Sequence, residues 1–291
     1  MLTRMLEDLP LQTCQLADGR TQAWRESGKS SEHGQTLVLL HGISSGSGSW
    51  VQQLAALGSA ERKVMAWDAP GYGGSDELAT TRPSALDYAE RLASWLESQG
   101  VERCWLVGHS LGAMIASAFA RRYPQRLSGL LLASPAQGYG KADAQTREQV
   151  FRKRPDVLQQ LGPEGLAQKR AAALVSPNAS ADQVALVADG MKKLRLAGFT
   201  AASWLLANDD IWSYLPVDSE PRRVICGGAD DITPPTAARQ LALDFGATEF
   251  VEIPAAGHAC YIEAADQVNQ VLLEWLSTTV TATSRQTGSV L

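Results

Sequence analysis

The sequence is short of the residues and segments that mark several classes of protein. It has four cysteines in 291 residues, and no two of them have the spacing of a metal site. No apolar run approaches the roughly 20 residues of a membrane-spanning helix. The first ten residues carry acids where a secretory signal peptide needs an uninterrupted apolar stretch. We therefore expect a cytoplasmic protein with no metal and no membrane segment.

Basic clusters are also missing. The chain has 26 Lys and Arg against 31 Asp and Glu, a net charge of −5, and no block of basic residues of the kind that binds nucleic acid. The glycine- and serine-rich residues 44–49 lack the lysine of a phosphate-binding loop, which excludes nucleotide binding there. No cofactor is indicated, and the expected partner is a small-molecule substrate. The sequence does not determine the oligomeric state.

The sequence does contain short apolar runs that alternate with segments of helical periodicity. This alternation predicts an α/β fold with a mainly parallel sheet and helices on both faces. The opening two strands should form a hairpin around Asp18 and Gly19. In such a sheet, functional residues lie at the carboxyl ends of the strands. We expect eight strands, at residues 11–16, 21–26, 36–40, 63–67, 104–107, 127–133, 224–226 and 249–253.

The rhythm of strands stops between residues 136 and 216. We interpret this stretch as a helical cap, or lid, inserted into a core domain formed by residues 1–135 and 217–291. The predicted helices of the cap lie at residues 142–153, 164–174, 181–193 and 196–207.

Aromatic residues gather in the second half of the predicted cap. An apolar underside would make a dry pocket for a substrate, although packing against the core is the simpler interpretation for any single aromatic residue. Lys192, Lys193 and Arg195 can pair with a substrate carboxylate, but a solvated helix face explains them more simply. The cap residues that we name as candidates for the pocket are Trp204, Trp212 and Tyr214.

Residues 108–112 read Gly-His-Ser-Leu-Gly, a G-x-S-x-G sequence between a strand-like run and a helix-like run. A serine on a tight strand-to-helix turn is held in a strained backbone conformation with its hydroxyl exposed. The flanking glycines let strand and helix approach closely, and the helix N-terminus favours a developing oxyanion. We predict that Ser110 is a nucleophile rather than part of an incidental glycine turn.

A nucleophilic serine needs a base, and four histidines make the search short. His33 lies in a polar turn, His41 ends an apolar run, and the side chain of His109 should point away from that of the neighbouring serine. His258 follows Gly257 on a loop beyond a strand-like run, from which it can reach the carboxyl edge of the sheet. We predict that His258 is the base; a surface-loop histidine is the alternative.

The acid that orients the histidine must lie on another loop at the same edge. Asp230 and Asp231 follow a buried strand, and one of them can orient His258 while the other caps a turn or faces solvent. The residues alone leave this choice open. The chain order of serine, aspartate and histidine distinguishes the α/β-hydrolase arrangement from the two other common serine triads.

Five motifs in this order resemble the α/β-hydrolase fold superfamily, in its branch of serine esterases with a helical cap. Residues 39–43 resemble the family's His-Gly oxyanion turn, residues 68–76 its Asp-x-x-Gly-x-Gly-x-Ser loop, and residues 108–112 its nucleophile elbow. Residues 227–234 resemble the loop of the acid, and residues 257–263 resemble the histidine loop with the helix after it. The resemblance implies the α/β-hydrolase fold.

The resemblance also implies roles for single residues. The family's acid stands three residues after the first glycine of its loop, which is Asp230 here. The backbone N–H groups of Ile43 and Leu111 correspond to the oxyanion hole. His41 and Gly42, in the oxyanion turn, are further candidates for the substrate pocket.

The function that these features predict is hydrolysis of a small carboxylic ester or lactone through an acyl-enzyme, as in a carboxylesterase. Epoxide hydrolases and haloalkane dehalogenases of this fold carry aspartate at the nucleophile position, so Ser110 argues against them. A ligand receptor that keeps the fold but has no catalytic turnover is a more distant alternative.

The nearest alternative is a carbon–carbon bond hydrolase that acts on vinylogous diketones from aromatic ring cleavage. These enzymes use the same triad, but a tryptophan commonly follows their catalytic histidine. Here the histidine is followed by Ala-Cys-Tyr at residues 259–261. Their oxyanion turn is also richer in glycine and proline, whereas in this chain Ser44 and Ser45 follow Ile43. Both departures favour the ester hydrolase.

Overall fold

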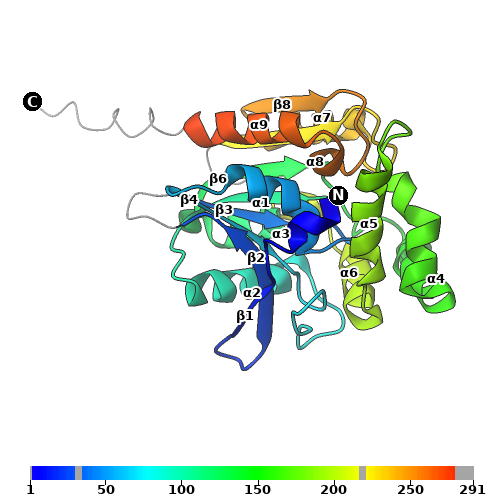
Figure 1. Cartoon of the computed structure of the whole chain (residues 1–291). Coiled ribbons are helices and arrows are strands. Elements are labelled where there is room, and N and C mark those ends of the chain that lie inside the picture. Colours follow the sequence, from blue (N-terminus) through cyan, green and yellow to red (C-terminus); the bar gives the residue numbers. More distant parts are fainter. Residues whose placement is uncertain (1, 30–34, 216–220, 279–291) are drawn as a thin grey trace, which may run out of the picture.

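An eight-stranded sheet forms the centre of the fold (Figure 1). Its order is β1-β2-β4-β3-β5-β6-β7-β8; β2 is antiparallel to both its neighbours, and the other pairs are parallel. All residues of the central strand β5 are buried, so both faces of the sheet are covered. This confirms the predicted sheet. The strands are β1 (Gln12–Gln15), β2 (Thr21–Ser27), β3 (Gln35–Leu40), β4 (Arg62–Trp67), β5 (Cys104–His109), β6 (Leu127–Ala133), β7 (Arg222–Gly227) and β8 (Glu249–Ile253).

Helices pack on the sheet in pairs. Helix α1 (Val51–Leu57) contacts α9 (Ala265–Ser277), whereas α2 (Ala85–Ser98) contacts α3 (Leu111–Arg122). Helix α2 begins close to the predicted start at residue 84. The Asp87 carboxylate caps this end by accepting a hydrogen bond from the backbone N–H of Ser84 at 2.7 Å. The remaining elements here are α7 (Pro235–Phe245), α8 (Cys260–Glu263), and the 3₁₀ helices η1 (Leu2–Leu6), η2 (Ser47–Trp50), η3 (Pro124–Arg126), η4 (Ala171–Leu174) and η5 (Ile211–Ser213).

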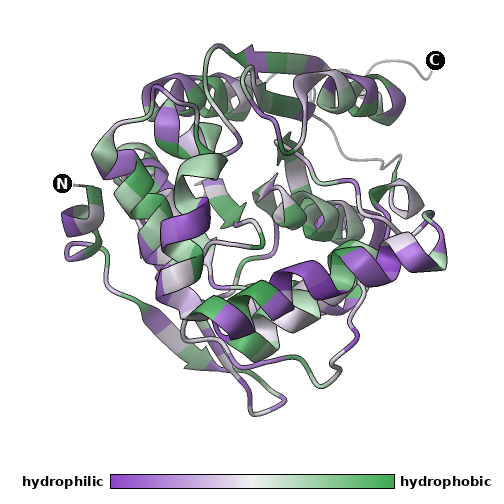
Figure 2. Cartoon of the chain, turned by 90° about the vertical axis from the view of Figure 1, so that its right-hand side faces the viewer, coloured by the Kyte–Doolittle hydropathy of each residue, from purple (hydrophilic) through white to green (hydrophobic). Residues whose placement is uncertain are grey.

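Three further helices lie together beyond one edge of the sheet, at the right of Figure 1. They are α4 (Ala144–Arg170), α5 (Ala181–Lys192) and α6 (Leu196–Asn208). Figure 2 views the molecule from this side, where hydrophilic and hydrophobic stretches alternate along the helices.

The course of α4 corrects the sequence prediction, which ended one helix at Lys153 and began another at Glu164. The helical path continues past Pro155 and breaks at Gly162, whose φ of 68° and ψ of 172° are not helical. Pro163 then restarts the helix at a position that needs no N–H partner. The break therefore falls on Gly162, which has a positive φ and directly precedes Pro163, and not at Pro155.

The structure describes residues 2–29, 35–215 and 221–278. His33 and the domain boundary predicted between residues 216 and 217 lie outside these ranges. Within them, no helix is long and apolar enough to cross a membrane. The cytoplasmic location stays a prediction.

Candidate active site

Ser110 stands on the turn between β5 and α3, as the sequence predicts. Its φ of 53° and ψ of −115° lie in a region that residues other than glycine rarely adopt, so the turn is strained. The turn also requires glycine, because a Cβ on Gly108 would lie 2.3 Å from the carbonyl oxygen of Gly112. The Ser110 N–H donates to the carbonyl of Ala133 at 3.0 Å, which ties the turn to the end of β6. The serine is thus held in one place at the carboxyl edge of the sheet.

A hydrogen-bonded histidine and aspartate lie at the same edge. Nδ1 of His258 is 2.9 Å from Oδ2 of Asp230. Asp230 is 2% exposed whereas Asp231 is exposed, so the structure brings Asp230 to the histidine. Oδ1 of Asp230 accepts the backbone N–H groups of Ile232 and Thr233, each at 2.9 Å, and Oδ2 also accepts the Thr233 hydroxyl at 2.8 Å. These four contacts fix the orientation of the carboxylate.

The same contacts decide where the protons are. Burial alone would raise the pKa of Asp230, but the hydrogen bond and charge of His258 and the bonds from Thr233 outweigh it and hold that pKa below its usual range. The carboxylate is therefore ionised and accepts the Nδ1 hydrogen of His258. In the neutral ring this leaves Nε2 without a hydrogen and able to take one.

His41 fixes the turn that follows β3. Burial lowers the pKa of His41, so its ring is neutral. Nε2 accepts the N–H of Ala69 at 3.0 Å, which puts the ring hydrogen on Nδ1, 2.8 Å from the carbonyl oxygen of Gly42. Because a peptide is planar and trans, holding this carbonyl also sets the direction of the Ile43 N–H. The Tyr72 hydroxyl donates to the carbonyl of Ile43 itself at 2.8 Å.

The first N–H of α3 lies close to this turn. Helix α3 begins at Leu111, and the N–H groups of the first turn of a helix have no partner within it. Ile43 and Leu111 both line one cavity together with Ser110. The two residues that carry these N–H groups thus border the same cavity as the serine.

His109 is a residue whose part in the site the sequence missed. Its ring lies 4.8 Å from that of His258, centroid to centroid, and its Nε2 is 2.9 Å from the His258 carbonyl oxygen. Burial and the nearby His258 lower the pKa of His109 to about 3, so the ring is neutral and Nε2–H donates this bond. His109 therefore ties the histidine loop to the end of β5. No pattern in the sequence distinguishes this role from that of any residue beside the serine.

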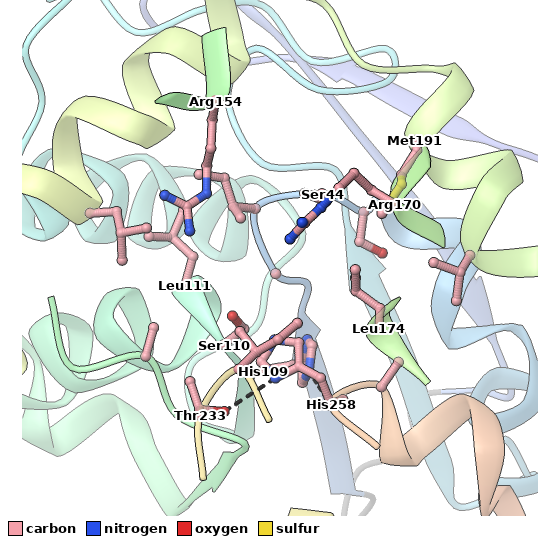
Figure 3. A pocket seen from close by; sticks show the side chains of 18 of the residues that line it. Ser44, His109, Ser110, Leu111, Arg154, Arg170, Leu174, Met191, Thr233 and His258 are labelled. Carbon is pink, nitrogen blue, oxygen red and sulfur yellow. Dashed lines mark hydrogen bonds between the residues drawn. The ribbon is translucent and has the colours of Figure 1, made fainter. Parts of the chain in front are cut away.

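These residues open onto a cavity of about 570 Å³ (Figure 3). Ser110 and His258 line it, and so do Gly42, Ile43 and Leu111. Its other side is formed by residues of α4, α5, α6 and η4, which are Lys153, Arg154, Val157, Leu166, Lys169, Arg170, Leu174, Val187, Met191, Phe199 and Leu206.

Four residues named as candidates for the pocket do not line this cavity. His41 lies behind the turn that it holds. Trp204 packs edge-on against Phe151, and its other neighbour is the Arg82 guanidinium, 4.7 Å from the ring centroid. The Tyr214 hydroxyl donates to Asp209 at 2.7 Å, and Trp212 packs against the hydrophobic core. These aromatic side chains are thus part of the packing between helices and core.

The cations of the cavity also differ from those that the sequence singled out. Lys193 pairs with Asp189 at 2.6 Å and Arg195 with Glu77 at 3.4 Å, and neither of them lines the cavity, nor does Lys192. The basic residues of the lining are instead Lys153, Arg154, Lys169 and Arg170. All four belong to α4, where the sequence gave no signal for a cavity. Figure 3 labels two of them, Arg154 and Arg170.

The described residues hold no group of three or more His, Cys, Asp and Glu side chains that could bind a metal ion. The four cysteines are free, and burial raises the pKa of the Cys226 thiol to about 12.

Comparison with known proteins agrees with this geometry. Residues 37–271, which include Ser110, Asp230 and His258, match the model of the alpha/beta hydrolase family. The chain belongs to this family. Among its hydrolase relatives, a protein named carbamate hydrolase RutD from Serratia proteamaculans is 29% identical, over 89% of this chain and 97% of the relative. The predicted membership of the alpha/beta hydrolases is thereby confirmed.

Other alpha/beta hydrolase relatives differ in their names. The dihydrolipoyllysine-residue acetyltransferase component of the acetoin cleaving system from Pseudomonas putida is 32% identical, over 89% of this chain and 67% of the relative. The solved structure of a thermophilic esterase from Thermogutta terrifontis superimposes with a TM-score of 0.80 at 26% identity and covers 92% of this chain and 98% of the esterase. An enol-lactonase from Burkholderia xenovorans has the same fold, with a TM-score of 0.76 at 20% identity, over 91% of this chain and 99% of that chain.

Proposed function

We propose that this alpha/beta hydrolase is a serine hydrolase that cleaves a small carboxylic ester or lactone through an acyl-enzyme. One observation carries the proposal. A serine on a strained turn and a histidine bonded to a buried, ionised aspartate line the same cavity. This is the set of groups that a serine nucleophile needs: the hydroxyl, a base, and a group that orients the base.

The reaction begins with Ser110. His258 Nε2 takes the hydroxyl proton as the serine oxygen attacks the substrate carbonyl, and Asp230 stabilises the imidazolium that forms. His258 then gives the proton to the leaving alcohol, and the carbonyl re-forms as an ester of the serine. Water, activated by the same histidine, attacks this acyl-enzyme and releases the acid.

The negative charge of each tetrahedral intermediate needs donors that are already in place. The N–H groups of Ile43 and Leu111 serve as these donors. Because a backbone turn and a helix start fix them, they need no rearrangement during the reaction, which is what makes such donors effective.

Helices α4 to α6 act as a cap. The described residues 136–215 form this cap and the remaining described residues the core, because side chains of α4, α5 and α6 close the cavity opposite Ser110. A cap of this kind shields the reacting carbonyl from water and shapes the pocket for the substrate.

A carbamate is a second candidate for the substrate, because relatives named carbamate hydrolase are 26–29% identical over most of the chain. The attacked group is again a carbonyl, and the same residues act on it. An ester is preferred here because the solved structure at 26% identity is that of an esterase.

Burst kinetics test the proposal. Wild type with 4-nitrophenyl acetate and butyrate should release one equivalent of 4-nitrophenol in a burst and then turn over steadily. Ser110→Ala should lose the burst and lower kcat roughly 10⁴- to 10⁶-fold. Ser117→Ala is the matched control, because the Ser117 hydroxyl is buried in α3, the helix that follows Ser110, and donates to the Ala113 carbonyl at 2.8 Å. Its kcat should stay within about threefold of wild type.

Three results would contradict the proposal. Retention of a tenth of the wild-type kcat by Ser110→Ala would remove the serine as nucleophile. Turnover of 4-nitrophenyl N-methylcarbamate in preference to both esters would favour the carbamate. Turnover of a vinylogous diketone, with no ester hydrolysed, would establish the carbon–carbon bond hydrolase instead.

A further inference from the structure

The charge of the cavity lining has one sign. Lys153, Arg154, Lys169 and Arg170 line the cavity, and no aspartate or glutamate within residues 2–29, 35–215 and 221–278 does. This contrasts with the whole chain, in which acids outnumber bases by 31 to 26. Figure 3 shows the guanidinium groups of Arg154 and Arg170 directed into the space above Ser110 and His258. Among the described residues, the side chains of the lining with permanent charge are therefore all cations.

Arg154 is the most confined of the four cations. It is half-buried, whereas the other three are exposed. Burial lowers the pKa of Arg154, and the charged or titratable groups that face it are the phenols of Tyr139 and Tyr72 and the cation of Arg170. It makes no ion pair or hydrogen bond with any residue that the structure describes. Removing a guanidinium from water without an anion is unfavourable, so this position favours an anionic ligand.

Other arginines of the chain do have carboxylate partners. Arg152, on the same helix, pairs with Glu148, and Arg195 pairs with Glu77 at 3.4 Å. Arg154 differs from these two in having no carboxylate partner among the described residues.

The break in α4 brings the two arginines to one cavity. Arg154 and Arg170 are sixteen residues apart, and a straight helix would separate them by about 24 Å along its axis. The non-helical backbone of Gly162 interrupts α4 between them. Both side chains consequently reach the cavity, from the two halves of the helix.

We propose that Arg154 and Arg170 form a subsite for a carboxylate, so that the substrate is an ester or lactone that carries a free carboxylate away from the reacting carbonyl. This assignment rests on the proposed ester hydrolysis. A guanidinium presents parallel N–H groups that match the two oxygens of a carboxylate. The apolar residues around them, among them Val157, Leu166 and Phe199, enclose the carbon chain between the two functional groups.

A pair of substrates tests the subsite through turnover. Mono(4-nitrophenyl) adipate carries a free carboxylate, and methyl 4-nitrophenyl adipate has the same chain without the charge. Wild type should show a kcat/KM roughly tenfold or more higher for the charged ester. This ratio should fall about tenfold in Arg154→Met and also fall in Arg170→Met, which lies at the exposed end of α4. It should be unchanged in Arg152→Met, which removes a cation of the same helix outside the cavity.

Direct binding separates the subsite from the catalytic proposal. Calorimetry with Ser110→Ala should detect monomethyl adipate, and binding should weaken about tenfold or more when Arg154→Met is added. Dimethyl adipate should bind the two proteins equally. If wild type hydrolyses neither 4-nitrophenyl ester while monomethyl adipate still binds through Arg154, the ester function is wrong and the subsite stands.

The opposite results would overturn the subsite. A wild-type preference for the neutral ester, or equal losses for both esters in Arg154→Met, would mean that the arginines do not recognise the carboxylate. Inorganic phosphate that binds as tightly as monomethyl adipate would make the site a general anion site and the carboxylate assignment wrong.

Discussion

The two sides of the cavity are built differently. On the strand side, which comprises Ser110, Asp230, His258 and the turns that hold them, the groups that position the reacting residues have fixed protein partners. Asp230 accepts four hydrogen bonds, and the carbonyl of His258 accepts one from His109. On the helix side, formed by α4 to α6, apolar side chains alternate with cations, and Arg154 makes no ion pair with a described residue.

This difference separates reaction from recognition. Groups that stabilise a transition state must be in place before the substrate arrives, and fixed partners achieve this. A group that binds part of the substrate must instead lack a protein partner, so that the ligand can become its partner. Substitutions on the strand side should therefore lower kcat, and those on the helix side should change which substrate is preferred.

Among the residues that support Ser110, the largest expected effect comes from Asp230. Asp230→Asn keeps the shape of the side chain but loses the charge and favours the wrong tautomer of His258, so kcat should fall about 10³- to 10⁴-fold. Asp231→Asn is the matched control, because its carboxylate is exposed beside the same loop; kcat should stay within about twofold. Steady-state kinetics with 4-nitrophenyl butyrate compare the two. A loss in Asp231→Asn alone would mean that the wrong aspartate is assigned.

The positions of the candidate residues on the strand side were largely predictable from the sequence. Strand-turn-helix context placed Ser110 on its turn and the glycine-preceded loop placed His258 at the same edge, because the backbone conformations there restrict the residue types. The choice between Asp230 and Asp231 required three-dimensional contacts or the family resemblance. The hydrogen bonds of His41 and His109 were not predictable, since any polar residue next to a turn has the same local pattern.

The helix side was not predictable at the level of residues. Ending the first helix at Lys153 left Arg154 in an expected loop, although helix and cavity both include it. The aromatic residues Trp204, Trp212 and Tyr214 were the natural candidates by size, but size favours packing in the core as much as contact with a ligand. Amphipathic helices encode which face is buried, not what that face encloses.

Variants of His41 test whether a residue that does not line the cavity still supports the reaction. His41→Leu removes the bond to the Gly42 carbonyl and frees the Ile43 N–H, so kcat should fall about 100-fold, as expected for a lost oxyanion donor, with a smaller change in KM. His41→Asn places an amide donor near the position of Nδ1 and should recover part of kcat. If kcat/KM falls equally in the two variants because KM rises while kcat is unchanged, His41 belongs to substrate binding instead.

The smallest expected effect concerns the stability of the break in α4. A comparison of two glycines on the helix side, Gly162 and Gly190, measures it. Gly162 has a φ of 68° and a ψ of 172°, a conformation that is essentially restricted to glycine, so Gly162→Ala should lower the free energy of unfolding by about 1–3 kcal/mol, although no atom lies within 4 Å of the new methyl group. Gly190→Ala, in the regular helix α5 with its nearest contact at 3.5 Å, should raise that free energy by about 0.5–1 kcal/mol. Urea denaturation measures both. Stabilisation by Gly162→Ala would mean that α4 runs straight in solution, and Arg154 and Arg170 would then be too far apart to bind one carboxylate.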